Sequence, residues 1–361
     1  MTADASSSRA HFIMPVAGLA VVVVAFVAVH FFRGEKPASP LQRGVAWLAA
    51  QQQPDGSWRG KEIAVLRPGP AMTAFVLYAM TRSSQPRYAE SLDRAARYLE
   101  SQINAEGIVG MTAEGPDYPN YATSLTVLSF VALKKQDSVG RMVDYLRRAQ
   151  LDEGEGWTTS DPEYGGWAFG GPPQPKPYAH RLDISMTRFA LEALAAAAVL
   201  ADDPVWSKAR KFLQTCQQKD GGFIFTPLTA QNKAGEGVSY GSATADGILS
   251  FGCAGGPNHA YEAAETWIRT NFTTERCPGF PPDHPRPWAD GLFGYWLASA
   301  SRIVDRTKVR DIVRVLTARQ RPDGSWVSSS DLMLENEPLL ATALAVLALT
   351  EANRRLLYSE S

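Results

Sequence analysis

Residues 43–58 read RGVAWLAAQQQPDGSW, and the pattern of this stretch returns along the chain. Residues 208–223, KARKFLQTCQQKDGGF, repeat it without a gap, and residues 316–326, LTARQRPDGSW, repeat its second half. A degenerate copy has Gln150 and Gly154 at the corresponding positions. In the better copies an amphipathic stretch leads to Gln, then to Gly four residues later, and then to an aromatic residue. The motif residues are Gln52, Gly56, Trp58, Gln217, Gly221, Phe223, Gln320, Gly324 and Trp326.

This motif predicts a junction at the end of a helix. The Gln side chain is expected to bond the carbonyl groups that are left free where its own helix ends. The Gly is expected to supply a left-handed turn, and the aromatic side chain to pack over the junction. The motif is therefore a structural element and says nothing directly about chemistry.

The repeat extends from about residue 40 to the C-terminus, with an amphipathic and a more apolar stretch in each unit. Self-similarity at this spacing, with two helices per unit, predicts an all-α repeat architecture. The amphipathic helices are expected at 42–53, 91–103, 140–150, 205–218, 260–271 and 308–320. The apolar helices are expected at 71–81, 121–134, 183–199, 242–253, 289–300 and 338–351. Near the start of the apolar helices stand Thr73, Thr123, Thr187, Thr244, Gly291 and Thr342.

The amphipathicity of the two sets predicts two layers. A helix that is polar on one side fits an outer layer, and a helix that is apolar all round fits an inner layer. An open superhelical array would need distinct polar caps, whereas the first and last units here are the most alike. We therefore predict a closed α/α toroid of six helix pairs over residues 41–355, with a tail at 356–361.

The Gln–Gly–aromatic motif resembles the Gln-Trp motif of squalene and oxidosqualene cyclases, which protein prenyltransferase β-subunits carry in a looser form. The resemblance covers about residues 40–355 and extends to the wider squalene cyclase-like and prenyltransferase/squalene oxidase repeat proteins. It implies the α/α toroid of the terpenoid cyclase and protein prenyltransferase superfamily.

The catalytic acid of class II terpenoid cyclases has no counterpart at the matching position. Those enzymes protonate an alkene with the middle Asp of an Asp-x-Asp-Asp-Thr motif. The matching stretch here is Asp183-Ile184-Ser185-Met186-Thr187, which places Ser185 at the acid position. A serine hydroxyl does not protonate an alkene, and N-capping of the following helix accounts for both Asp183 and Ser185.

The zinc ligands of prenyltransferase β-subunits are also missing. Asp290 matches the Asp of their Asp-x-Cys pair, but Leu292 stands where the Cys belongs, and the next unit has no His. A zinc site needs three or four ligands, so no metal is expected. The Cys-Gly-Glu-Gln thioester motif of complement-like toroids is absent, because Cys253 lies in the sequence Phe-Gly-Cys-Ala-Gly.

Several carboxylates stand at the expected starts of inner helices, and these starts share one mouth of a closed toroid. Each either complements its own helix dipole or, together with the others, provides a general acid with a raised pKa. The catalytic candidates are Asp183, Asp246 and Asp290, with Glu335 and Glu337 in the same class. Aromatic residues of the inner helices either line an isoprenoid pocket or pack in the core. The ligand-binding candidates are Phe75, Tyr78, Phe130, Phe189, Phe251, Phe293 and Trp296.

Three Pro/Gly-rich loops, 151–180, 219–241 and 272–288, are expected to lie over the same mouth. Loops of this length often form lids or binding surfaces. His180 and His284 lie in these loops without the further ligands that a metal site requires.

Residues 13–32 read IMPVAGLAVVVVAFVAVHFF, with His30 as the strongly polar side chain. A helix of this length matches the hydrocarbon core of a bilayer. A cleavable signal peptide is the alternative, but its apolar stretch is usually shorter and ends in small residues. We predict a tail at 1–12, a retained single-pass anchor at 13–32, a linker at 33–40 and an extracytoplasmic C-terminal domain.

Composition limits the function further. The chain has 361 residues, 45% of them hydrophobic, and a formal net charge of −1, which argues against disorder and against nucleic-acid binding. Its three cysteines provide neither a disulfide framework nor a Cys-x-x-Cys metal site. No cofactor is expected, and a protein partner is left open.

Three functions remain. The first is a membrane-anchored, squalene cyclase-like toroid that binds an isoprenoid or another apolar ligand in a central cavity. The second is a divergent terpenoid cyclase-like enzyme, an intramolecular transferase that uses a carboxylate at the mouth. The third is a glycan-processing or glycan-binding toroid, because α/α toroids also host glycosidases with paired carboxylates.

Overall fold

The computed structural model describes residues 38–173, 175–177, 181–228, 231–256 and 258–357. The anchor predicted at 13–32 lies outside these residues, and so do the positions from 358 onward. Among the residues that are described, no helix combines the length and the apolarity needed to cross a membrane. The chain divides into two units, Met1–Ser39 and Pro40–Ser361, and the second is described below.

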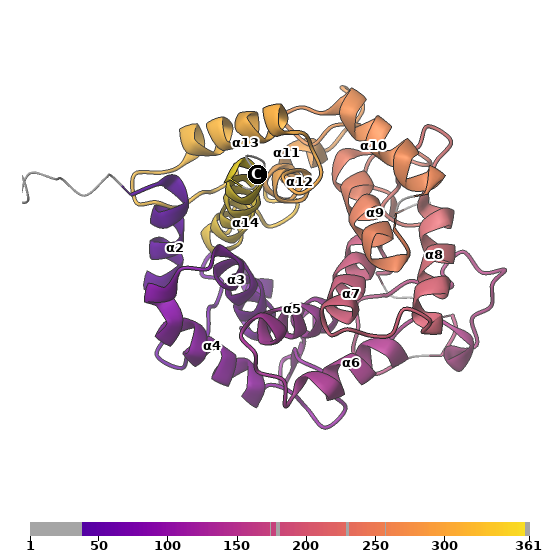
Figure 1. Cartoon of the computed structure of the whole chain (residues 1–361), viewed down its shortest axis with the longest axis horizontal. Helices are drawn as coiled ribbons and strands as arrows, with labels where there is room; N and C mark the ends of the chain where they lie inside the picture. The colour runs from indigo at the N-terminus through magenta and orange to yellow at the C-terminus, as the bar shows by residue number, and fades with distance from the viewer. Residues whose placement is uncertain (1–37, 174, 178–180, 229–230, 257, 358–361) are drawn as a thin grey trace, which may run out of the picture. The chain divides into compact units, whose positions relative to one another are not determined.

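The unit Pro40–Ser361 is an α/α toroid, as the repeat predicted (Figure 1). Its outer helices are α2 (Pro40–Ala50), α4 (Ala89–Ser101), α6 (Val139–Arg148), α8 (Pro204–Cys216), α10 (His259–Asn271) and α13 (Arg306–Arg319). Its inner helices are α3 (Pro70–Ser83), α5 (Pro119–Ala132), α7 (Ile184–Ala196), α9 (Gly241–Ala254), α11 (Trp288–Gly291) with α12 (Phe293–Ala300), and α14 (Pro338–Leu357). Each inner helix contacts the next, and α14 contacts both α12 and α3, which closes the ring.

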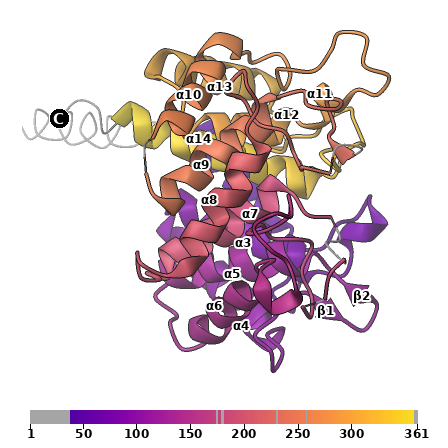
Figure 2. The same cartoon turned by 90° about the vertical axis from the view of Figure 1, so that its right-hand side faces the viewer.

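Short elements and long loops lie at one end of the toroid, where the inner helices begin. They include the antiparallel hairpin of β1 (Met111–Thr112) and β2 (Gly115–Pro116), which Figure 2 shows on the same side as α11. Single turns of 3-10 helix occur here at Ala64–Leu66 and Glu153–Glu155, whereas the turn at Pro86–Tyr88 connects the end of α3 to the start of α4 at the opposite end. The connections at this end form the mouth that the sequence analysis anticipated.

Each motif Gln joins neighbouring repeats, which differs from the predicted bond to its own helix end. Gln52 Nε2 donates to the carbonyl of Gly56 in its own turn (3.0 Å) and to that of Ser91 in α4 (2.9 Å). The other three Gln side chains likewise bond the first turn of the next outer helix. Those pairs are Gln150 with Val205, Gln217 with Ala260, and Gln320 with Pro40. The last pair runs from α13 back to α2 and closes the outer layer.

The motif tryptophans perform the task that was expected of the Gln, and Phe223 in the remaining copy has no side-chain donor for it. Trp58 Nε1 donates to the carbonyl of Leu48 at the end of α2 (2.7 Å), and its backbone N–H donates to Thr73 Oγ1 (2.9 Å). The recurrent Thr therefore connects each turn to the inner helix. The same backbone contact to Thr recurs for Val109 with Thr123, Trp167 with Thr187, Phe223 with Thr244, and Trp326 with Thr342.

The fourth copy of the motif uses a different glycine from the one predicted. Gln150 bonds the carbonyl of Gly165, not Gly154, and pairs with Trp167 as a β-bridge. Gly165 has a φ of 87°, and a Cβ at this position would lie 1.9 Å from the backbone oxygen of Lys208. Only glycine fits there, because the turn has both a left-handed conformation and a direct backbone contact. Residues 151–164 are an insertion between the Gln and its turn.

The fifth inner helix is interrupted at Leu292, whereas the sequence predicted one helix over 289–300. The Glu335 carboxylate accepts hydrogen bonds from the backbone N–H groups of Gly294 (2.7 Å) and Tyr295 (2.9 Å). These N–H groups belong to the first turn of α12, where a side-chain oxygen acts as a cap. The acceptor comes from a loop about forty residues downstream, so local sequence gave no sign of the break.

Replacing Gln320 with Ala is expected to lower the free energy of unfolding by about 1–3 kcal/mol, since two carbonyl groups lose their donor. Urea unfolding of the full chain in detergent, followed by circular dichroism, measures the change. The matched control is Gln214→Ala on the exposed face of α8, expected to stay within about 0.5 kcal/mol of the wild type. Equal effects of the two substitutions would show that the α13–α2 junction does not stabilise the ring.

Candidate ligand cavity

A cavity of about 470 Å³ opens at the loop-covered end of the toroid. Its volume is within the usual range of small-molecule sites. Most of its lining is aliphatic or aromatic and comes from the first turns of inner helices and from the loops above them. The apolar lining residues are Val65, Leu66, Ala71, Met72, Phe75, Leu125, Phe189, Phe225, Ala243, Leu292, Leu332, Met333, Leu334, Leu340 and Leu344. The others are Tyr118, Tyr121, Arg181, Ser185, Lys233, Tyr240, Ser242, Asp246, Tyr295 and Glu335.

The candidate carboxylates fall into three groups. Asp246 and Glu335 line the cavity, and Asp183 is buried directly behind its lining residue Ser185. Asp290 is exposed and outside the lining, so the structure does not bring it to the others. Glu337 is buried beneath the loop that follows Trp58, where its Oε2 accepts from the backbone N–H groups of 61–63.

Asp183 is the N-cap of α7 and is also covered by Ser185. Its Oδ1 accepts from the Met186 N–H (2.8 Å) and from the Ser185 hydroxyl (2.6 Å), and the Tyr121 hydroxyl lies 2.5 Å from Ser185 Oγ. Burial raises the pKa of Asp183, and the Ser185 hydrogen bond acts in the opposite direction. Tyr121 and Ser185 therefore present hydroxyl groups to the cavity in place of the carboxylate.

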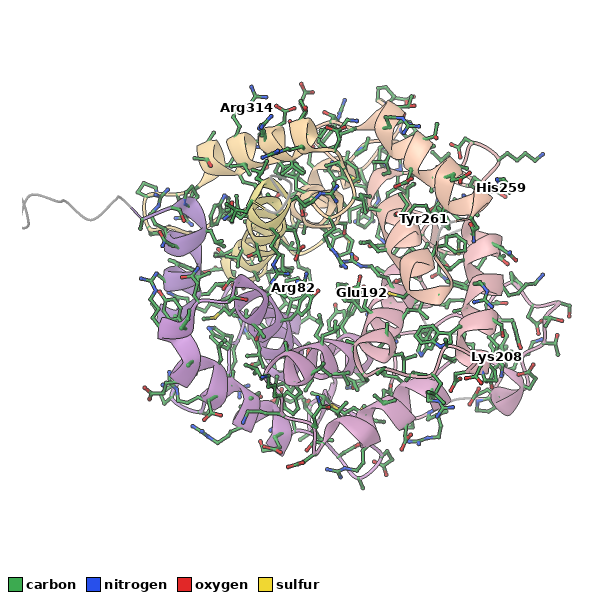
Figure 3. The ribbon with its side chains drawn as sticks, viewed as in Figure 1. Arg82, Glu192, Lys208, His259, Tyr261 and Arg314 are labelled. Atoms are coloured by element: carbon green, nitrogen blue, oxygen red, sulfur yellow. The ribbon has the colours of Figure 1, made fainter. Side chains whose placement is uncertain are left out.

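Asp246 is part of a buried network of charges that crosses the centre of the ring. Arg188 Nη1 donates to Asp246 Oδ1 (2.8 Å), and Arg188 Nε donates to Glu192 (2.9 Å). Arg302 also donates to Glu192 (2.7 Å), and the Tyr295 hydroxyl donates to Asp246 (3.0 Å). Figure 3 shows Glu192 toward the middle of the ring, whereas Lys208 and Arg314 lie on the outer helices.

The two acids of this network have opposite pKa shifts. Burial raises the pKa of Asp246 to about 6, although the Arg188 charge opposes it. Burial alone would also raise the pKa of Glu192, but the charges of Arg188 and Arg302 outweigh it and lower the pKa to about 2. We call this network beneath the cavity the ionic floor; its members are Arg188, Glu192, Asp246 and Arg302. Asp246 is the member that lines the cavity.

Lys233 contributes an amine to the cavity, which the sequence analysis did not identify. It lies in the loop between α8 and α9. Its Nζ lies over the face of Phe225 and 5.9 Å from the centroid of the Trp288 ring. Burial lowers the pKa of Lys233 to about 7, against the charges of Asp183 and Asp246. Its position in the Pro/Gly-rich loop 219–241 was the available signal.

The aromatic candidates divide between the cavity and the core. Phe75 and Phe189 line the cavity, and Tyr78 lines a smaller pocket below it together with both of them. Phe130, Phe251, Phe293 and Trp296 are buried outside the lining; Phe251, for example, packs edge-on against Phe223. The lining aromatics that sequence reasoning missed are Tyr118, Tyr121, Phe225, Tyr240 and Tyr295.

The predicted loops contribute unequally to the mouth. The loop 219–241 supplies Phe225, Lys233 and Tyr240, and Arg181 follows directly after the loop 151–180. The loop 272–288 supplies no lining residue, and residues 332–335 after α13 contribute instead. Within the described ranges, His, Cys, Asp and Glu side chains nowhere cluster in groups of three or more that would hold a metal ion.

Glu335 is expected to make the stability of the toroid depend on pH. Burial raises the pKa of Glu335 to about 8, although its two backbone hydrogen bonds lower it. The folded state therefore holds a proton that the unfolded state loses above about pH 4.5, so this contribution to stability is lost as pH rises toward 8. Relative to Glu335→Gln, the free energy of unfolding of the wild type should fall by about 1.4 kcal/mol for each pH unit in this range.

Urea unfolding of both proteins between about pH 5 and 8 measures this difference. The exposed acid Glu262, changed to Gln, is the control and should leave the pH profile of the wild type unchanged. Parallel profiles for wild type and Glu335→Gln would contradict a protonated Glu335.

The profile of the A-macroglobulin TED domain matches residues 19–231, which is more than half of the chain. The chain belongs to this family. Membership in the TED domain family agrees with the toroid, whereas the thioester sequence of complement-like toroids is absent here. No curated protein gives a significant sequence match.

Solved structures similar to this TED-family chain share its fold at low sequence identity. A protein from Actinoplanes has a TM-score of 0.60 and 17% identity, covering 87% of this chain and 98% of that one. A variant of the type II terpene cyclase MstE from Scytonema, in complex with its substrate geranylgeranyl dihydroxybenzoate, has a TM-score of 0.57 and 14% identity over 88% and 97%. An unsaturated glucuronyl hydrolase specific for heparin has a TM-score of 0.58 and 13% identity over 89% and 97%.

Proposed function

We propose that the toroid binds an isoprenoid or a similar long apolar molecule in its central cavity. The observation that carries this proposal is the lining, which is mostly aliphatic and aromatic around about 470 Å³. Binding an apolar ligand there removes apolar surface of both partners from water, which is the main favourable term for such a site. Four successive inner helices of the ring contribute to this lining, through Leu344 of α14, Phe75 of α3, Leu125 of α5 and Phe189 of α7.

We favour binding without catalysis, because the position of the catalytic acid in the cyclase motif holds a serine here. Ser185 stands at that position, and it donates to Asp183 while that carboxylate caps α7. The substrate in the similar MstE complex carries a geranylgeranyl chain, which supports the choice of an isoprenoid as the probe.

The test is equilibrium binding of tritiated geranylgeraniol to the full chain in detergent, compared with an unsaturated heparin disaccharide. Saturable binding of the isoprenoid at about one molecule per chain is expected, with no saturable binding of the sugar. Binding of the disaccharide alone would contradict the proposal and favour the glycan function that the similar glucuronyl hydrolase suggests.

We also propose that residues 13–32 anchor the chain in a membrane with the toroid on the extracytoplasmic side. Twenty positions in which His30 is the one strongly polar side chain support this, and an anchor would keep the cavity near a source of apolar ligands. Resistance of the chain to alkaline carbonate extraction, lost on deletion of 13–32, is the expected result. Protection of the toroid from protease added to intact cells would contradict the orientation.

A second candidate function is a divergent terpenoid cyclase-like activity, and Asp246 is the observation that favours it. Its carboxyl faces the cavity, is bonded by Tyr295, and has a pKa of about 6 because it is buried. Such a group exchanges a proton near neutral pH more readily than an ordinary aspartate. Conversion of geranylgeranyl substrates by the wild type, lost in Asp246→Asn with binding retained, would establish this activity.

A further inference from the structure

The Lys233 amine is held in place by its neighbour in the loop. Asn232 Oδ1 accepts from the Phe225 N–H (2.9 Å), and Asn232 Nδ2 donates to the Val238 carbonyl (3.0 Å). These bonds fix Asn232 against Phe225 and Val238 and so hold the neighbouring Lys233 in the cavity wall, with Nζ over the Phe225 ring. The amine is therefore presented to the cavity by a constrained loop.

The amine has no acidic partner of its own among the residues that the structure describes. The contacts of Lys233 Nζ within the described residues are with the rings of Phe225 and Trp288, whereas the nearby acids are bonded to other groups. Asp246 is bonded to Arg188 and Tyr295, and Asp183 is bonded to Ser185 and to the start of α7. An amine in an apolar wall without such a partner is available to a ligand.

We propose that Lys233 forms an imine with the carbonyl group of an apolar aldehyde bound in the cavity. This inference rests on the proposed function, because the aldehyde must first enter the apolar site. It defines the ligand class more narrowly: a long apolar chain that ends in a carbonyl group. Desolvated lysines in apolar pockets are activated as nucleophiles toward carbonyl substrates.

The reaction balances without an oxidant or a reductant. The amine lone pair attacks the carbonyl carbon, and the C=O electron pair moves to oxygen, which receives a proton from nitrogen. A second proton then binds the hydroxyl group of the carbinolamine, which leaves as water while the nitrogen lone pair forms the C=N bond of a protonated imine. Loss of the proton from nitrogen returns the one that was taken up and gives the neutral imine. Aldehyde and amine thus give imine and water, and the same steps in reverse release the aldehyde.

The surroundings of Lys233 suit each stage of this reaction. Its pKa of about 7, lowered by burial, leaves much of the amine neutral at physiological pH. Asp246, with its pKa of about 6, lines the same cavity and exchanges protons in that range. The protonated imine keeps the positive charge of lysine, so the face of Phe225 and the charges of Asp183 and Asp246 stabilise it.

The experiment traps the imine by reduction. The full chain in detergent is incubated with geranylgeranial and sodium cyanoborohydride, and the labelled lysines are then located by peptide mass spectrometry. The expected product is an adduct on Lys233 whose mass is that of the aldehyde less one oxygen atom. Labelling there should exceed labelling of the exposed Lys219 at least about tenfold, because only the cavity lysine is activated.

The controls separate this proposal from the binding function. Lys233→Arg, checked for folding by circular dichroism, should lose the adduct, and Lys219→Arg should keep it. Excess geranylgeraniol, which has no carbonyl group, should suppress labelling of Lys233 in the wild type.

Saturable binding of tritiated geranylgeraniol without preferential labelling of Lys233 would overturn the imine and leave the binding function intact. Absence of both binding and labelling would overturn both.

Discussion

Replacing Arg188 with Met is expected to lower the free energy of unfolding by about 3–5 kcal/mol, because it leaves the buried Asp246 without its cation and Glu192 with Arg302 alone. Arg188 is 4% exposed and bonds both Asp246 (2.8 Å) and Glu192 (2.9 Å). Removing one partner of a buried network costs more than the network contributes in net terms, since the remaining charges stay desolvated. Urea unfolding of the full chain in detergent measures the loss.

Two further proteins make this result specific. Arg97→Met breaks an exposed pair with Asp93 and should cost no more than about 1 kcal/mol. Adding Asp246→Asn to Arg188→Met removes the uncompensated charge and should restore much of the lost stability. A loss for Arg188→Met as small as that for Arg97→Met would contradict the account of the ionic floor.

Replacing Ala243 with Phe is expected to weaken geranylgeraniol binding at least about tenfold, which is about 1.4 kcal/mol in binding free energy. Ala243 lies in α9, lines the cavity, and is 2% exposed, so a larger side chain must occupy space that the ligand needs. Stability should fall less than for Arg188→Met, because the ring extends into an existing cavity and not into packed core. Equilibrium binding of the tritiated alcohol measures the effect.

Ala201→Phe is the control for this substitution, since Ala201 is exposed in the turn after α7. It adds the same aromatic group away from the cavity and should leave the dissociation constant unchanged. Undiminished binding by Ala243→Phe would mean that the isoprenoid is held elsewhere, such as on the detergent-facing surface of the chain.

The fold was predictable because its determinants repeat within short stretches. The Gln–Gly–aromatic motif and the recurrent Thr lie within one repeat, so the pattern alone indicated helix boundaries and the number of pairs. The partner of each Gln was not predictable, because Ser91 or Pro40 belongs to the next repeat. The break at Leu292 was missed for the same reason, since Glu335 is remote in sequence.

The cavity was less predictable than the ring. An inner helix is apolar on all sides, so periodicity does not distinguish the side that faces the cavity from the side that faces the outer layer. Phe189 and Phe251 both looked suitable, but only Phe189 lines the cavity. Lys233 and Tyr240 come from a loop, where no helical period applies, and their positions depend on contacts such as those of Asn232.

Apolar ligand binding by the toroid is tested most directly by mass spectrometry of the molecules that co-purify with the full chain in detergent. The comparison sample is residues 1–40 fused to an unrelated soluble domain, which carries the same anchor region without the toroid. The account predicts one apolar, isoprenoid-like species that is enriched with the toroid and depleted in Ala243→Phe. Bulk phospholipid in equal amounts from both samples, with no species specific to the toroid, would contradict it.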